Sequence, residues 1–231
     1  MKARQILFNT EMVQAILGGR KIHTRRPVQK PFKECDDFDS VDNVQGFARC
    51  PFGKPGDLLY VRETWNAVHF SYDYESGCCD EWYAAEKIPE KKSSFYVTVY
   101  AADGGWDNDA YERGFPWRPN IHMPRWASRI TLKVERVWVE RVQNIDELRA
   151  LNEGIKELSN CSPPNYSKTE KQYMGGDCVG FKTAKDAFSY LWDSIYNQQK
   201  DIRKNFPWES NPWVWACEFS VIKKNIDEVI G

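Results

Sequence analysis

Two stretches of the sequence gather basic side chains without an acidic residue, and these side chains are the first candidates for chemistry. Residues 12–33 contain six Lys and Arg, so this stretch carries a formal charge of +6. Residues 113–134 contain four Arg and one Lys. Clustered cations are suited to phosphate contacts, although the ordinary reason for such a run is a solvated surface. The charge pattern therefore leaves anion binding and plain solvation open.

The second basic stretch also carries aromatic rings among its cations. Arg118 and Arg125 lie near Trp117, His122 and Trp126 in the sequence. An exposed aromatic ring stacks on a nucleic-acid base with about 1–3 kcal/mol, while guanidinium groups contact the phosphates. The same tryptophans can instead anchor a proline-rich loop to the core. We therefore weigh a nucleotide-binding surface and a packed loop as two interpretations of one pattern.

The whole chain is nearly neutral, so the two basic stretches are local features. Its 231 residues include 32 Lys and Arg and 33 Asp and Glu, which gives a formal net charge of −1. This balance excludes a polybasic protein whose entire surface coats nucleic acid. Aromatic residues make up 14% of the chain, which is too many large apolar groups for a disordered protein.

Cysteine usage and hydropathy indicate the compartment. The chain has seven Cys and three His without a CxxC pair, which indicates neither a disulfide framework nor a zinc site. No apolar run approaches the roughly 18 residues that span a bilayer, and the first residues carry too short an apolar run for a secretory signal. We expect a cytoplasmic protein with reduced thiols, no membrane contact, no metal and no cofactor.

Hydrophobic periodicity predicts strands that alternate with short helices. The predicted strands cover residues 58–62, 95–101, 130–142 and 212–222. The predicted helices are residues 12–17 after a Thr10 cap, 145–153 after an Asn144 cap, and 184–197 after a Thr183 cap. Residues 20–27 are expected to form a tight basic turn before Pro27. Because βαβ periodicity and a GxGxxG turn are both lacking, the pattern favours a small mixed barrel over a Rossmann sheet.

One domain with long excursions is the expected organisation. The domain covers residues 1–222, and residues 223–231 form a C-terminal tail. Three polar or irregular stretches are expected to be insertions, namely residues 66–94, 103–117 and 157–182. They are positioned to cover a pocket, to enlarge the substrate or to bind a partner.

Four motifs together carry a resemblance to a known family. They are GRKIHTRRP, CPFGKPGDLLYVRETW, RPNIHMPRWASRITLKV and NPWVWACEF. In these motifs the chain resembles the ASCH family of PUA-like proteins, especially the longer members encoded by phages and prophages. The likeness extends in order from Ile6 to Val221. It implies an α+β fold, a PUA-like mixed β-barrel flanked by short helices, and association with RNA.

One branch of that family is an amidohydrolase that removes the acetyl group from N4-acetylcytidine with a lysine, a threonine and a glutamate. Its G-R-K-x-x-T-x-R motif is matched by Gly19, Arg20, Lys21, Thr24 and Arg26. Its glutamate lies in a short helix after a long strand, where this chain has Glu153. The resemblance thus implies Lys21, Thr24 and Glu153 as catalytic residues. The chain is about twice as long as the compact amidohydrolases, and the excess lies in the insertions.

Amide hydrolysis needs a nucleophile, a proton carrier and a stabilised oxyanion. In this scheme the Thr24 hydroxyl attacks, and Lys21 takes its proton if burial and neighbouring arginines lower the lysine pKa. Glu153 orients the lysine or carries the proton to the leaving amine, and Arg26 holds a phosphate or the anionic intermediate. The ordinary alternative is that Lys21 and Thr24 are turn residues with local backbone contacts.

Further side chains are expected to line the substrate site. Glu63 directly follows a predicted strand, either as a competing carboxylate or in a structural ion pair with an arginine. Trp65 lines the pocket or packs in the core. The full set of expected substrate-binding residues is Arg20, Arg25, Arg26, Glu63, Trp65, Trp117, Arg118, His122, Arg125 and Trp126.

Three functions follow as hypotheses. The first is a protein that binds RNA or a modified nucleoside and hydrolyses the amide of an N4-acylated cytidine. The second is a ribonuclease, after another branch of the family. The third is a non-catalytic nucleic-acid reader, or a phage accessory protein whose insertions bind a protein partner. Whether the chain is an enzyme is left open by the sequence.

Overall fold

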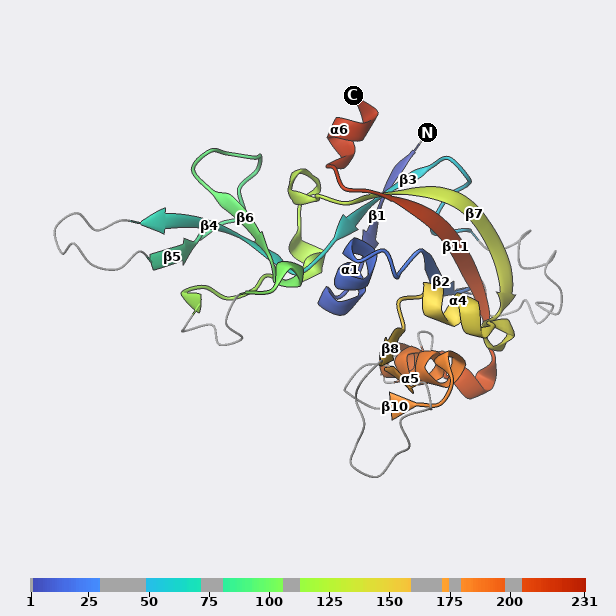
Figure 1. The fold of residues 1–231 in the computed structure, drawn as a ribbon. Coiled ribbons are helices and arrows are strands. Elements are labelled where there is room, and N and C mark those ends of the chain that lie inside the picture. The colour runs from blue at the N-terminus through green and yellow to red at the C-terminus, as the bar shows by residue number, and fades with distance from the viewer. Residues whose placement is uncertain are drawn as a thin grey trace, which may run out of the picture. The chain divides into compact units, whose positions relative to one another are not determined.

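Figure 1 shows a computed structural model of the chain, an α+β protein whose described strands form three sheets. The structure describes residues 2–29, 49–71, 81–105, 113–158, 172–174, 180–197 and 205–231. No helix within these ranges is long and apolar enough to cross a membrane. The α+β class predicted from the sequence is confirmed.

The largest sheet has five strands in the order β1-β3-β7-β11-β2. Their bounds are β1 (Ala3–Leu7), β2 (His23–Pro27), β3 (Leu58–Arg62), β7 (Thr131–Arg141) and β11 (Trp213–Ile222). Strands β1 and β3 are parallel, whereas β3 pairs antiparallel with β7 and β2 pairs antiparallel with β11. The order ends at β1 and β2, so the described strands show a mixed sheet without the pairing that would close a barrel.

Two of the predicted insertions contribute strands to small antiparallel sheets. Strands β4 (Trp65–Ser71), β5 (Glu81–Ala84) and β6 (Val97–Tyr100) have the order β5-β4-β6. Strands β8 (Lys156–Leu158), β9 (Gln172–Met174) and β10 (Gly180–Phe181) have the order β10-β9-β8. Only β6 lies within a predicted strand, because the others lack a sustained two-residue alternation. Of the insertion at 103–117, residues 106–112 lie outside the described ranges.

The three predicted helices lie close to their predicted positions, but only one of the three predicted N-caps is confirmed. The described helices are α1 (Thr10–Leu17), α4 (Glu147–Asn152), α5 (Ala184–Tyr196) and α6 (Ile226–Ile230), with short 3-10 turns between strands. Thr183 caps α5 as predicted, accepting a hydrogen bond from the Asp186 amide. The other two predicted caps are wrong. Thr10 lies inside α1, where Asn9 accepts from the Met12 amide, and Asp146 rather than Asn144 caps α4.

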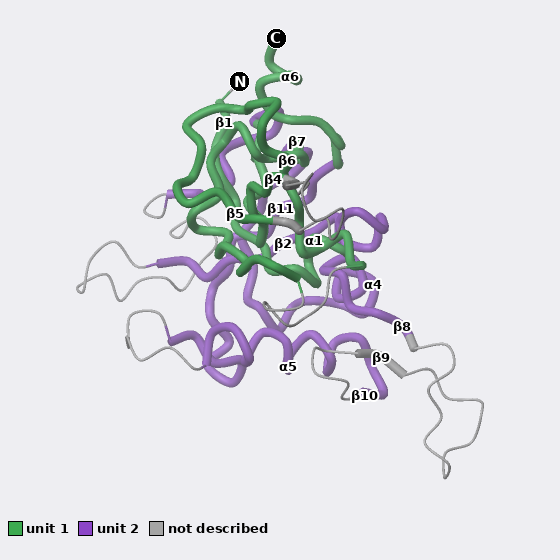
Figure 2. The backbone as a smooth tube through the Cα atoms, turned by 90° about the vertical axis from the view of Figure 1, so that its left-hand side faces the viewer, with its two compact units in different colours: residues 1–14, 58–133, 221–231 green, residues 15–57, 134–220 purple. Residues whose placement is uncertain are grey.

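The described chain divides into two compact units, each built from segments far apart in the sequence (Figure 2). Unit 1 comprises residues 1–14, 58–133 and 221–231, and unit 2 comprises residues 15–57 and 134–220. Trp65, Tyr100 and Met123 belong to the core of unit 1, and Phe188 and Trp192 belong to the core of unit 2. Residues 223–231, expected to be a tail, contain α6 with a fully buried Ile226. The single-domain boundary remains a prediction.

Candidate functional site

The basic segment that carries the family motif is a strand rather than the expected tight turn. Residues 23–27 form β2, which pairs with β11. Just before β2, the Ile22 amide donates to the Asn152 carbonyl at 2.9 Å, and the Ile22 carbonyl accepts from the Phe219 amide at 3.0 Å. Pro27 is tolerated because it lies at the end of an edge strand. The correction has a physical cause, since pairing with β11 outweighs the weak strand preference of a run of charged residues.

Lys21 and Glu153 meet although 132 residues separate them in the sequence. The Lys21 Nζ donates to Glu153 Oε2 and to the Glu153 carbonyl, each at 2.8 Å. Both side chains are buried, with exposures of 1% and 5%. Gly154 has a φ of +101°, and a Cβ there would stand only 3.3 Å from the Lys21 Cβ. A glycine after Glu153 therefore lets this backbone lie close against Lys21.

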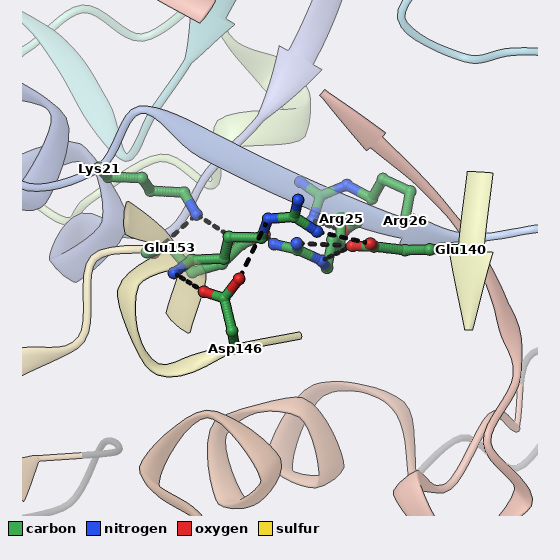
Figure 3. A network of polar contacts seen from close by, with 7 residues as sticks. Lys21, Arg25, Arg26, Glu140, Asp146 and Glu153 are labelled. Atoms are coloured by element: carbon green, nitrogen blue, oxygen red, sulfur yellow. Dashed lines mark hydrogen bonds and ion pairs between the residues drawn. The ribbon is translucent and has the colours of Figure 1, made fainter. Parts of the chain in front are cut away.

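Arg25 extends this contact into a chain of charges (Figure 3). Its NH1 donates to Glu153 Oε1 at 2.8 Å, and its Nε and NH2 donate to Glu140 Oε1 at 2.9 and 2.6 Å. Arg149, which is partly exposed, donates to Glu140 Oε2 at 3.1 Å and pairs with Asp146 at 3.4 Å. These residues form the Lys21–Glu153 network, which runs from a buried lysine to a partly exposed arginine.

Burial and neighbouring charge shift the pKa values of the central pair. Burial lowers the pKa of Lys21 from its ordinary 10.5, with Arg26 and Arg25 adding to the shift and Glu153 opposing it. Burial alone would raise the pKa of Glu153, but the charges of Lys21 and Arg25 and their hydrogen bonds outweigh it and hold that pKa below its ordinary value. The lysine is shifted towards its neutral form, which is the direction that a general base requires.

Thr24 does not share the face of Arg25. It is buried and lies opposite Cys217 in the register between β2 and β11. Because side chains alternate along a strand, Thr24 projects from the opposite face of β2 to Arg25. Of the three residues that the resemblance assigns to catalysis, the described contacts join Lys21 and Glu153. The role of Thr24 stays a prediction.

Sequence reasoning missed three members of the network, the partly exposed Arg149, the exposed Asp146 and the buried Glu140. Glu140 lies in the predicted strand 130–142 among Val and Trp residues and is 8% exposed. A carboxylate at a buried position of a strand requires a cationic partner, and that requirement was the signal available in the sequence. The partner, Arg25, was expected to bind substrate and to help lower the pKa of Lys21.

The other expected binding residues of unit 2 are at the periphery of the network. Arg20 is exposed, and its NH1 donates to the Gly154 carbonyl at 2.9 Å. Arg26 is half-buried and contacts the Tyr196 hydroxyl at 3.5 Å. Lys30 and Lys33 lie outside the described ranges.

Glu63 belongs to unit 1. It forms an ion pair with an arginine, which was the second of the two roles predicted for it. Its fully buried carboxylate accepts from Arg129 Nε at 2.9 Å and from Arg129 NH2 at 3.0 Å. The remaining guanidinium nitrogen donates to Asp103 at 2.6 Å, and the guanidinium lies 3.8 Å from the centre of the Tyr100 ring. Burial raises the pKa of Glu63, although the hydrogen bonds and charge of Arg129 oppose the shift.

The expected stacking tryptophans of unit 1 take part in packing. Trp65 is fully buried, with its ring 5.8 Å from that of Trp126 in an edge-to-face arrangement. Trp126 is half-buried and donates from Nε1 to the Pro89 carbonyl at 2.9 Å. Trp117 is also half-buried, and the guanidinium of Arg113 lies 4.9 Å from its ring centre. Of the two roles considered for Trp65, lining a pocket or packing in the core, its burial fits core packing.

Arg118 and Arg125 of the second basic stretch form hydrogen bonds or ion pairs within the protein. Arg118 donates from Nε to the Asn66 side chain at 2.9 Å and from NH2 to the Ala85 carbonyl. Arg125 pairs with Asp227 at 2.6 Å. His122 is exposed. The expected binding residues thus fall into two groups, one in each unit.

Of the two cysteines within the described ranges, Cys50 and Cys217, neither forms a disulfide. Burial raises the pKa of Cys217 to about 12, so its thiolate is suppressed at neutral pH. The other cysteines, Cys35, Cys78, Cys79, Cys161 and Cys178, lie outside the described ranges.

Compared with known proteins, the chain matches no family model, no curated sequence and no solved structure. The resemblance to the ASCH family therefore rests on the four motifs alone, and what it implies enters as a proposal.

Proposed function

We propose that the chain is an ASCH-type, PUA-like protein that binds RNA or a modified nucleoside, and that the Lys21–Glu153 network hydrolyses the amide of an N4-acylated cytidine. One observation carries the proposal. The family resemblance assigned Lys21 by its motif and Glu153 by its position to catalysis, from segments 132 residues apart, and their side chains form a buried contact of 2.8 Å. A buried lysine with a lowered pKa beside a carboxylate is a frequent arrangement at catalytic sites, although structural ion pairs also produce it.

The reaction assigns one task to each group. Neutral Lys21 takes a proton from the nucleophile, which is either the Thr24 hydroxyl or a water molecule, and the nucleophile adds to the acyl carbonyl carbon. A nearby cation such as Arg26 stabilises the resulting oxyanion. The carbon–nitrogen bond then breaks, and the proton passes through Lys21 or Glu153 to N4 of the leaving cytidine. Attack by Thr24 leaves an acyl ester, which water hydrolyses to the free acid.

Access to the lysine is a further requirement of this reaction. Lys21 is only 1% exposed, so substrate can reach Nζ only after the surrounding segments open. Binding energy from the rest of the nucleoside is the available source for that opening. We therefore expect kcat to fall strongly for truncated substrates that lack part of the nucleoside.

The decisive experiment incubates the purified full chain with N4-acetylcytidine and follows cytidine and acetate by chromatography. We expect the wild-type protein to release both, and Lys21→Met and Glu153→Gln to lower kcat by about 10²- to 10⁴-fold, the usual contribution of proton transfer. Glu135→Gln is the matched control, because Glu135 is an exposed glutamate on β7, the strand that also carries Glu140. Thermal unfolding of each variant identifies any that fails to fold.

Absence of acetate release by the wild-type protein overturns the proposal, and so does equal release by all folded variants. Thr24→Val distinguishes the nucleophiles, since it abolishes turnover if the hydroxyl attacks and spares it if water does. Incubation with labelled RNA, with and without divalent metal, tests the ribonuclease alternative. Binding of RNA that does not weaken as salt rises would argue against contacts through the basic stretches.

A further inference from the structure

A pair of aromatic side chains lies beside the Lys21–Glu153 network. His23 is 7% exposed and shares the face of β2 that carries Arg25, two residues on. Its ring meets the half-buried Trp138 ring edge-on, with 5.7 Å between the ring centres. The guanidinium groups of Arg25 and Arg149, both members of the network, lie 5.9 and 5.6 Å from the Trp138 ring centre.

Each ring of this pair holds a buried nitrogen that lacks a hydrogen-bond partner among the described residues. The two atoms are His23 Nδ1 and Trp138 Nε1. An unsatisfied buried polar group is costly, and such groups in native proteins nearly always have a protein or water partner. These two nitrogens therefore need a polar partner from outside the described residues, which a bound ligand or a water molecule would supply.

Other buried indoles show why this pair stands out. Trp126 and Trp192 donate from Nε1 to backbone carbonyls at 2.9 and 2.8 Å, so the fold itself can satisfy such a group. Trp65 and Trp215 also lack a partner among the described residues. Trp65 belongs to the apolar core of unit 1, and Trp215 pairs with Arg26 in the register, which places it on the face of Thr24. Among these described indoles, Trp138 is the one whose ring meets a second ring with an unpaired nitrogen and also lies against arginines of the charged network.

We infer that His23 and Trp138 bind the hydrogen-bonding edge of the pyrimidine base of the substrate. The inference rests on the proposed function and names how the same site would recognise cytidine. An indole N–H only donates, so Trp138 suits an acceptor such as the carbonyl oxygen or ring nitrogen of cytosine. The Nδ1 of a neutral imidazole is a donor in one tautomer and an acceptor in the other, so it can pair with either kind of group on the mixed edge of that base.

The surroundings of His23 favour the neutral imidazole. Burial lowers the pKa of His23, and Arg25 and Arg149 act in the same direction, whereas Glu153 and Glu218 oppose them. A neutral ring keeps its acceptor nitrogen for the ligand. The two residues are positioning residues in this scheme, since neither transfers the reacting proton.

The test measures binding of cytidine, the reaction product, by isothermal titration calorimetry, because binding requires no turnover. Trp138→Phe removes the N–H and keeps an aromatic ring, and we expect it to weaken cytidine binding about five- to tenfold, the value of one hydrogen bond. The matched control is Trp213→Phe, because Trp213 on β11 also carries an arginine over its ring, with Arg141 4.3 Å from the ring centre. This control should bind cytidine as the wild-type protein does.

Kinetics separate this inference from the proposed function. With N4-acetylcytidine, His23→Gln and Trp138→Phe should raise KM with little change in kcat, which a general loss of structure would not produce. Turnover that is unaffected in a folded Trp138→Phe variant overturns the inference and leaves the function standing. Cytidine binding that weakens in Trp138→Phe without any hydrolysis supports the base site and removes the proposed reaction. Failure of the wild-type protein to bind cytidine overturns the inference.

Discussion

Each of the two units holds a buried glutamate that contacts an arginine, and the two glutamates differ in their pKa. In unit 2, Glu153 has a pKa below its ordinary value. In unit 1, Glu63 has a pKa above it. Both carboxylates lose hydration through burial, which raises a carboxyl pKa. The difference must therefore come from their partners.

The number and burial of the cations explain the contrast. Glu153 contacts two buried cations, Lys21 and Arg25. Among the described cations, Glu63 contacts only Arg129, whose side chain is 26% exposed and also pairs with Asp103. Two unscreened charges outweigh the cost of burial, whereas one shared and partly hydrated charge does not. The unit 1 pair is thus a locally satisfied contact, and the unit 2 network is the one that also perturbs a lysine.

The largest expected effect is on stability. Glu153→Ala leaves Lys21 and Arg25 buried without their shared counter-charge, which should destabilise the protein by about 3–5 kcal/mol. Glu63→Ala should cost less, about 1–3 kcal/mol, because Arg129 keeps Asp103 and reaches solvent. Urea unfolding of the two variants measures the difference. An equal or larger loss for Glu63→Ala would mean that the number and burial of the cationic partners do not determine the cost of removing each carboxylate.

The second prediction concerns the pH dependence of stability, which should have opposite signs in the two units. Because the folded pKa of Glu153 lies below the ordinary 4.5, its contribution is present above that pH and is lost as the pH falls through the folded pKa. Because the folded pKa of Glu63 lies above 4.5, its contribution falls as the pH rises from 4.5 through the folded pKa.

Urea unfolding at a series of pH values below and above 4.5 measures how the free energy of unfolding changes with pH. The wild-type protein is compared with Glu153→Gln and with Glu63→Gln. The stability of the wild-type protein should rise with pH relative to Glu153→Gln and fall relative to Glu63→Gln, each by at most about 1.4 kcal/mol per pH unit. Two falling slopes would show that burial alone governs both carboxyls, and two rising slopes would show that the cations outweigh burial at Glu63 as well.

The smallest expected effect is at an exposed ion pair of unit 1. Arg125 and Asp227 have side-chain exposures of 40% and 60%. Asp227→Asn should change stability by less than about 0.5 kcal/mol, because solvent screens such pairs. The change should shrink further in high salt. If Asp227→Asn and Glu63→Ala lose comparable stability in the same urea titration, burial does not determine how much each ion pair contributes to stability.

Much of the regular structure could be predicted from local pattern. Strand β3 coincides with the predicted residues 58–62, and Thr183 caps α5 as predicted, since both depend on short runs of neighbouring residues. Strand β2 was missed because its HTRRP sequence has no apolar alternation, and its strand conformation comes from β11. Residues 65–71 and 81–84 were missed because each depends on a neighbouring strand of the three-stranded sheet.

The sequence by itself determined which residues deserved to be tested as a site, because residue type and motif spacing are local properties of the chain. Lys21 was identified by its motif, and Glu153 by the position that the resemblance to the ASCH family implies. Only the tertiary structure decided that they touch, that Arg25 joins them to Glu140, and that Thr24 lies on the other face of β2. Contacts across 115 to 132 residues depend on strand pairing and burial, and these are properties of the folded chain that no short stretch encodes.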